Sequence, residues 1–94
     1  MADINVQVNI DDNGKNFDYA YRVTTEDELQ KVLNELKDYI KKQGAKRVRI
    51  SIDAETKKEA ERFAAILIDV FDDLGYNDIT VTFTGDTVRV EGQL

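Results

Sequence analysis

Five segments of this chain alternate between apolar and polar residues, so each predicted β-strand has one apolar face and one polar face. The segment over residues 3–10 shows the pattern clearly, with Ile4, Val6, Val8 and Ile10 on one side. Strands of this kind need cover on one face only. The helices that the sequence predicts must therefore lie on the same side of a single sheet.

Two turn signals join four of these strands into hairpins. Asn13-Gly14 favours a type I′ turn, because that turn requires positive φ at both central residues. With these residues in the loop, apolar residues of the first strand lie opposite apolar residues of the second. The predicted pairs are Asp12–Lys15, Ile10–Phe17, Val8–Tyr19, Val6–Tyr21 and Ile4–Val23. A two-residue turn at Gly85-Asp86 likewise places Val88 and Val90 opposite Phe83 and Val81.

Two helices are predicted from their caps and their apolar spacing. Thr25 with Glu28, and Thr56 with Glu59, form capping boxes at the helix starts. Gly44 and Gly75 supply the left-handed residues that end the helices. Apolar residues recur at helical spacing: Leu29, Val32, Leu33, Leu36, Tyr39 and Ile40 in the first helix, and Ala60, Phe63, Ala64, Ile66, Leu67, Ile68, Val70, Phe71 and Leu74 in the second.

The predicted order of elements is ββαβαββ, an α+β two-layer fold with two helices on one face of the sheet. Right-handed crossovers place the third strand beside the first, and the fifth between the third and fourth. The sheet order is then 2-1-3-5-4, with every neighbouring pair antiparallel. A ferredoxin-like arrangement is the alternative, but its βαββαβ order does not fit two terminal hairpins. With no linker or repeat, the 94 residues predict a single α/β domain over residues 1–94.

Several stretches distributed along nearly the whole chain carry a resemblance to known proteins. They read DDNGKNFDY, LQKVLNEL, DYIKKQGAKRVRIS, TKKEAE, FAAILI, LGYNDI and GDTV, and they closely resemble the Top-Seven family of de novo designed α/β proteins. The resemblance implies the same five-stranded, two-helix fold and no activity, substrate or cofactor. It departs mainly at surface positions, notably Asp69, Asp72 and Asp73.

The sequence also reads as designed without that resemblance, because caps, turns and patterning all indicate one structure. We therefore predict a de novo designed protein with no natural biochemical function, serving as a fold-design test or a stable scaffold. Two alternatives stay open. One is an engineered binding module that uses the acidic helix end or the open sheet face. The other is self-association through the edge strand 78–84, which has high β propensity and no charge beyond Asp78.

Composition excludes several kinds of chemistry. The chain has no Cys, which removes disulfides, thiolate metal ligands and thiol nucleophiles, and no His to transfer protons near neutral pH. The five glycines are accounted for by turns and helix ends, with Gly92 expected to end the last strand, so none is left for a phosphate-binding loop. We expect no enzyme activity, no catalytic, cofactor-binding or metal-binding residues, and no cofactor.

Charge and hydropathy limit the partners and the location. The net charge of −6 argues against nucleic acid and acidic membranes, and no apolar run approaches the length of a membrane span. The N-terminus, from Met1 and Ala2 through Asp3 to Ile4, lacks a basic region followed by an apolar stretch, so we expect no signal peptide or other targeting signal. We expect a soluble monomer without partners.

Four groups of residues resemble sites but have simpler interpretations. Asn9 to Gly14 imitates the start of a calcium loop, but its twelfth position is Ala20 rather than Glu, so the hairpin is favoured. The pairs Glu26/Glu28 and Glu55/Glu59 lie at helix starts or on exposed faces with cations nearby, so they are not expected to act as acid–base pairs. Ser51 has no His to activate it.

The fourth group consists of charged residues at the surface, in the second helix and on the open face of the sheet. Asp69, Asp72 and Asp73 lie where the helix dipole prefers cations, and are interpreted as a solvated surface rather than a weak cation site that includes Asp78. The arginines of the open sheet face are expected to pair with Asp18 or Glu91 rather than to bind RNA, because the aromatic residues fall on the other face. These arginines are Arg22, Arg47, Arg49 and Arg89, and the aromatic residues are Phe17, Tyr19, Tyr21 and Phe83.

Overall fold

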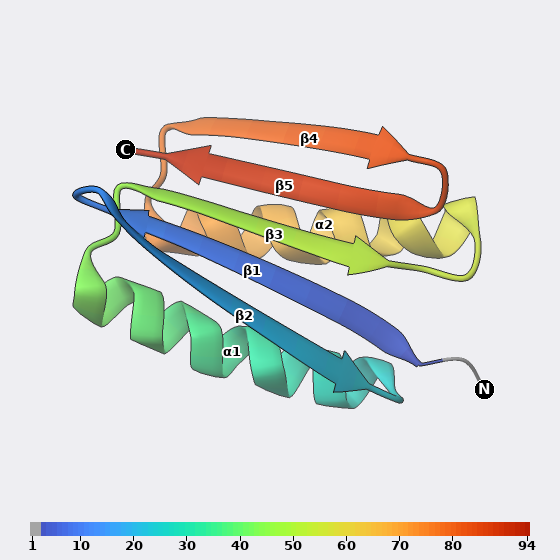
Figure 1. The fold of residues 1–94 in the computed structure, drawn as a ribbon. Coiled ribbons are helices and arrows are strands. Elements are labelled where there is room, and N and C mark those ends of the chain that lie inside the picture. Colours follow the sequence, from blue (N-terminus) through green and yellow to red (C-terminus); the bar gives the residue numbers. More distant parts are fainter. Residues whose placement is uncertain (1–2) are drawn as a thin grey trace.

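The computed structural model describes residues 3–94 and confirms the predicted order of elements. These are β1 (Ile4–Asp12), β2 (Lys15–Val23), α1 (Glu26–Gln43), β3 (Arg47–Asp53), α2 (Lys57–Leu74), β4 (Asp78–Thr84) and β5 (Thr87–Gln93). The strands form one sheet in the order β2-β1-β3-β5-β4, and every neighbouring pair is antiparallel. Both helices lie behind this sheet in the view of Figure 1. Met1 and Ala2, where no signal peptide was expected, lie outside the described residues.

The two hairpins adopt the predicted registers. Asn13 and Gly14 both have positive φ, at 53° and 83°, as a type I′ turn requires. All five predicted pairs between β1 and β2 are present, from Asp12 opposite Lys15 to Ile4 opposite Val23. The C-terminal hairpin turns at Gly85 and Asp86, and its predicted pairs are also present. Turn chemistry and hydrophobic pattern therefore specify the same register at both ends of the chain.

Both helices begin at the predicted threonines. The Thr25 hydroxyl accepts a hydrogen bond from the Glu28 N–H at 3.1 Å, and Thr56 accepts one from Glu59 at the same distance. In the usual capping box the glutamate side chain accepts a hydrogen bond from the N-cap residue itself. Here it accepts one from the residue before the N-cap. The Glu28 carboxylate accepts from the Thr24 hydroxyl at 2.9 Å, and the Glu59 carboxylate from the backbone N–H of residue 55 at 3.0 Å.

The core lies between the sheet and the two helices. Among residues 3–94 every buried side chain is hydrophobic, and the largest fully buried ones include Phe63, Phe71 and Leu33. The helices cover the middle of the sheet better than its edges. Phe17 on β2 and Phe83 on β4 do face the helix side, as predicted, but they remain 41% and 45% exposed. Apolar residues at the margins of the helices, Tyr39 and Ile68, are also exposed.

Gly92 corrects one prediction. It was expected to end the last strand, but it lies inside β5, opposite Val48 on one side and Ile79 on the other. A Cβ atom at this position would lie 2.3 Å from the ring of Phe71 on α2. The glycine therefore leaves space for a ring from the helix layer, and strand termination does not explain it.

Candidate functional site

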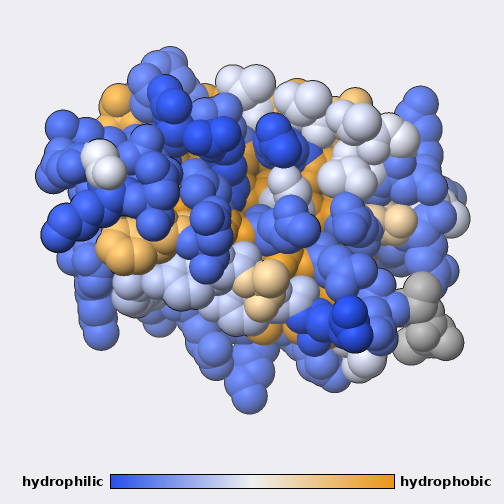
Figure 2. All heavy atoms as spheres, in the orientation of Figure 1, coloured by the Kyte–Doolittle hydropathy of each residue, from blue (hydrophilic) through white to orange (hydrophobic). Residues whose placement is uncertain are grey.

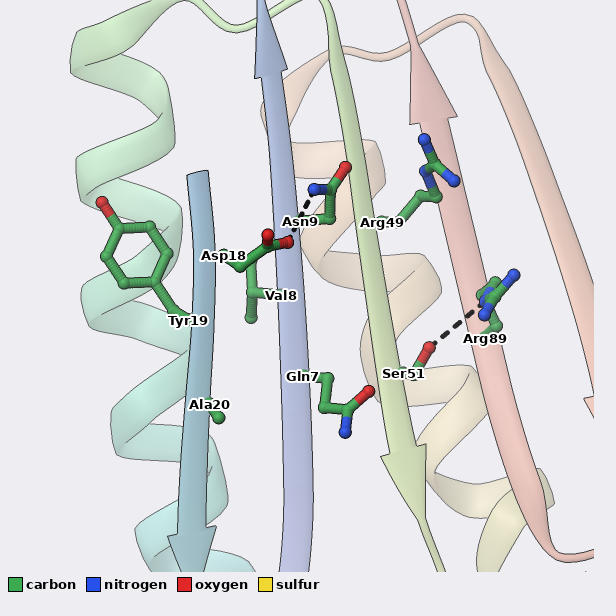
Figure 3. Close-up of a pocket in the computed structure, with 9 residues that line it drawn as sticks. All are labelled: Gln7, Val8, Asn9, Asp18, Tyr19, Ala20, Arg49, Ser51 and Arg89. Carbon is green, nitrogen blue, oxygen red and sulfur yellow. Dashed lines mark hydrogen bonds between the residues drawn. The ribbon is translucent and has the colours of Figure 1, made fainter. Parts of the chain in front are cut away.

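The face of the sheet opposite the helices is open and polar, and it carries most of the residues that could form a site. Figure 2 shows mainly hydrophilic side chains, with apolar atoms visible between them. The strand registers place Ala20, Gln7, Ser51, Arg89 and Thr82 side by side across the sheet. Because Ala20 and Ser51 are small, this row is lower than its neighbours, and a hollow of about 370 Å³ lies along it (Figure 3).

The polar groups around this hollow mostly bond to one another. Arg89 Nε donates to Ser51 Oγ at 3.3 Å, and Asn9 Nδ2 donates to Asp18 Oδ1 at 2.8 Å (Figure 3). Two atoms at its rim, Asn9 Oδ1 and Arg49 Nε, are shielded from solvent and have no hydrogen-bond partner within residues 3–94. Because both atoms are shielded, the groups that the hollow presents to a ligand are the exposed parts of the Arg49 and Arg89 side chains.

Two of the four arginines of this face pair across strands as expected, whereas Arg22 pairs with Asp3 and Arg89 bonds to Ser51. Glu91 forms ion pairs with both Arg47 and Arg49, with N–O distances of 3.4 Å and 3.9 Å. Asp18, the other expected partner, is bonded to Asn9 instead. All of these side chains are partly exposed, so each ion pair contributes at most about 1 kcal/mol to stability.

The acidic end of α2 is more structured than the sequence indicated. The Asp73 carboxylate lies 3.2 Å from Lys37 Nζ on α1, so it links the two helices. Asp69 and Asp72 are exposed, and neither side chain has a partner within the described part of the chain. No three acidic side chains come together among residues 3–94 in a way that could hold a metal ion.

The remaining predicted features have local structural roles. The calcium-like segment from Asn9 to Gly14 forms the end of β1 and its turn. Glu28 and Glu59 act in the helix caps, and Glu26 pairs with Arg62 on the neighbouring helix. These carboxylates therefore help to hold helices and caps together.

Tyr76 is the most informative residue that sequence reasoning missed. Its hydroxyl donates to the carbonyl oxygen of Ala45 at 2.6 Å, which connects the ends of α1 and α2. Burial raises the pKa of Tyr76, and the nearby negative charge of Asp12 raises it further. Its neighbour Gly75 bonds to the Asp72 carbonyl, and Tyr76 N–H bonds to the Phe71 carbonyl at 3.3 Å.

These two backbone bonds form a Schellman motif, and the motif provides the missing signal. An apolar residue directly after the glycine usually packs against the last turn of the helix. Here the rings of Tyr76 and Phe71 lie 5.9 Å apart. The sequence Leu74-Gly75-Tyr76 could therefore have placed Tyr76 in the core.

A second hollow, of about 210 Å³, lies where α1 meets the edge strand β2. Its lining is mostly apolar and includes Tyr19, Tyr39 and Leu36. The hydroxyls of Tyr19 and Tyr39 are 3.3 Å apart, and their hydrogen bond, with smaller effects of desolvation and charge, raises the pKa of Tyr19. This contact ties the helix to the edge of the sheet.

Comparison with known proteins identifies the origin of the fold. No protein-family model and no curated protein matches the chain. Among solved structures, the NMR structure of the de novo designed protein Top7NNSTYCC matches with 74% identity and a TM-score of 0.85. The match covers 99% of this chain and 88% of that one. The chain belongs to the Top7 family of computationally designed proteins.

Other designed proteins share the Top7 architecture. Top7m13 is 52% identical, with a TM-score of 0.59, over 100% of this chain and 88% of its own. The artificial protein M7 is only 29% identical but has a TM-score of 0.92 over the full length of both chains. The chain is thus a de novo scaffold without a natural function, and membership of the Top7 family implies no natural enzymatic role. No helix within residues 3–94 is long and apolar enough to cross a membrane.

Proposed function

We propose that this chain is a stable single-domain scaffold over residues 1–94, monomeric at micromolar concentration and without catalytic, cofactor-binding or metal-binding residues. The observation that carries this proposal is the uniformly apolar core, in which every buried side chain of residues 3–94 is hydrophobic. Catalytic groups are usually titratable side chains whose pKa values are shifted by burial and by charged neighbours. Here the carboxylates and amines lie at the surface, and many of them are engaged in caps and ion pairs.

The fit between backbone conformation and residue type supports the same proposal. Natural proteins commonly sacrifice stability at a functional site, where a strained backbone or a buried polar group is retained for its chemistry. Within residues 3–94 the positive-φ positions are four glycines and Asn13, all at turns or helix ends, where they fit the local geometry. We therefore expect a stability above that of an ordinary domain of this size.

Guanidinium unfolding followed by circular dichroism tests this proposal. The expected result is one cooperative transition with a midpoint above about 5 M, the range of hyperstable proteins. Two transitions would contradict a single domain. A single transition at an ordinary midpoint would contradict the scaffold, because it would mean that part of the surface is optimised for something other than folding.

A second candidate function is ligand binding on the open sheet face. The hollow beside Asn9, Arg49 and Arg89 presents two guanidinium groups, which favour a small anion such as phosphate or a carboxylate. Amide chemical shifts followed during a titration with inorganic phosphate test this function. Saturable shifts near Arg49 that are lost in Arg49→Gln but kept in Arg22→Gln, a change at the margin of the same face, would support it. Unsaturable or scattered shifts would dismiss it.

The acidic helix end is tested in parallel, because it is the other candidate surface of a binding module. Titration with calcium chloride or with a lysine-rich peptide should leave the amides of Asp69, Asp72 and Asp73 unchanged if this surface is only solvated. Saturable shifts confined to these residues would instead identify a cation or basic-peptide site.

A further inference from the structure

The sheet ends in two free edges that differ in charge. At one edge, β2 carries Lys15, Asp18 and Arg22, which are charges of the kind that discourage pairing with another chain. At the other edge, β4 reads DITVTFT and has no charged residue after Asp78. No described residue lies beyond β4 in the sheet order. The β4 edge is therefore the one that is open to another strand.

The register of the sheet determines which backbone groups face this edge. Leu94 N–H donates to the Lys46 carbonyl at 2.9 Å, so the even-numbered residues of β5 direct their backbone groups to β3. Because these directions alternate along a strand, the odd-numbered residues of β5 bond to β4. Their partners are Thr84, Thr82, Thr80 and Asp78. The N–H and C=O groups of Ile79, Val81 and Phe83 therefore point away from the sheet.

The three residues whose backbone groups point outward are arranged symmetrically about Val81. This symmetry suggests that the partner is a second copy of the same strand. We propose that two copies of this chain associate through β4 in an antiparallel pair, with Val81 opposite Val81 and Ile79 opposite Phe83 of the second copy. In this register the outward N–H and C=O groups meet in hydrogen-bonded pairs, and the two sheets become continuous. Shifting the strands by one residue would place Thr opposite apolar residues and lose this match.

Side chains on both faces are compatible with the same register. On the helix side, Phe83 is 45% exposed and Ile79 and Val81 are half-buried, so the second copy would cover apolar surface that the helices leave open. On the open side, Thr80 lies opposite Thr82 of the second copy, a pairing that is favourable across strands. Asp78 lies opposite Thr84, so no like charges face each other directly.

The association should be weak and should strengthen with salt. Two seven-residue strands bury less surface than the roughly 1,200 Å² of a typical stable interface. Each copy also carries a net charge of −6, and this repulsion is screened as ionic strength rises. The proposal is independent of the scaffold function, because failure to associate would leave the unfolding result unchanged.

Sedimentation equilibrium tests the proposal between about 10 µM and about 2 mM, which brackets a dissociation constant near 1 mM. The expected result is a reversible monomer–dimer equilibrium that strengthens with added NaCl, together with concentration-dependent amide shifts at residues 79, 81 and 83. A constant monomer mass over the whole range would overturn it. So would growth beyond a dimer, because pairing through one edge is closed by its two-fold symmetry.

Two double variants at exposed positions test the register. Thr80→Lys with Thr82→Lys sets lysines opposite lysines and should weaken association at least about tenfold. Thr80→Lys with Thr82→Glu sets opposite charges face to face and should strengthen it about two- to thirtyfold. The matched control, Asn16→Lys with Ala20→Lys, adds the same two charges to the open side of β2 and should retain association. If the all-lysine variants on the two edges change association equally, the assignment to β4 is overturned. Circular dichroism verifies that each variant is folded.

Discussion

The ring of Phe71 on α2 occupies the space that a side chain at Gly92 on β5 would fill. A Cβ atom built on Gly92 would lie 2.3 Å from Phe71 Cδ2 and 2.7 Å from Cε2, both much closer than a van der Waals contact. Gly92 has no positive φ, in contrast to the other four glycines. This residue is therefore glycine because of the space it leaves, and the other glycines because of their backbone conformation.

Replacing Gly92 with Ala tests this relationship. The added methyl group must displace the Phe71 ring from a close-packed core, and we expect a loss of about 1–3 kcal/mol of unfolding free energy. Guanidinium titration of the wild type and variant measures the loss. Adding Phe71→Leu should restore part of it, so the two substitutions should be non-additive. Strict additivity in this double-mutant cycle would mean that the ring and the glycine do not compete for space.

Tyr76→Phe tests the hydrogen bond from Tyr76 to Ala45. The variant keeps the ring in the core but leaves the Ala45 carbonyl without its partner, so we expect a loss of about 0.5–1.5 kcal/mol near neutral pH. A similar change, Tyr21→Phe, removes a tyrosine hydroxyl on the half-buried edge strand and should cost less. Equal losses for the two variants would contradict the role assigned to Tyr76.

The raised pKa of Tyr76 predicts how stability changes at alkaline pH. The ordinary value is 10.0, and the folded protein holds the phenolic proton more tightly than the unfolded chain does. The resulting stabilisation is complete below the unfolded pKa, and it is lost as the pH rises through the folded pKa. Melting temperatures measured from pH 8 upward should therefore fall above about pH 10, and fall less steeply in Tyr76→Phe. Identical pH profiles would exclude Tyr76 as the source.

The acidic end of α2 predicts different outcomes for two neighbouring aspartates. Asp72→Lys removes a charge that the helix dipole disfavours and should stabilise by about 0.5–1 kcal/mol. Asp73→Lys also removes a charge that the helix dipole disfavours. However, it breaks the ion pair with Lys37 and leaves two lysines close together. It should therefore be neutral or destabilising. Urea titrations at elevated temperature measure both, and the difference between the variants should shrink in 1 M NaCl if it is electrostatic.

The helix caps give a fifth prediction. Thr25→Ala and Thr56→Ala each remove the hydroxyl that accepts the N–H of the third helical residue, and each should cost about 1 kcal/mol. Thr→Ser at the same positions keeps the hydroxyl and should cost much less. If Ser and Ala variants lose the same stability, the methyl group rather than the cap hydrogen bond is responsible.

The fold was predictable because its determinants are local. Asn13 and Gly14 set the turn, and the apolar alternation on either side requires the same register, so two independent signals agree. The handedness of the crossovers then places β3 beside β1. Neither step needs knowledge of how particular side chains pack.

The features that sequence reasoning missed depend on contacts between distant parts of the chain. Gly92 was interpreted as a strand end, because the ring that requires it lies on α2, far away in the sequence. The link between Asp73 and Lys37 depends on how the two helices sit side by side. The hollow on the open face likewise results from small residues that meet only once the sheet has formed. Pattern and turn chemistry predict the register, but not which side chains from different layers come into contact.

The central strand β3 lies in the middle of the sheet and also in the middle of the chain. It pairs Asp53 with Asn5 on one edge and Arg47 with Gln93 on the other, and each pair spans about half the sequence. The terminal hairpins are local and can form quickly, whereas β3 must wait for two long loops to close. The pairings of β3 are therefore the most sequence-distant ones in the sheet. We expect the hairpins to gain amide protection before β3 does, and the docking of β3 to determine how fast the chain folds.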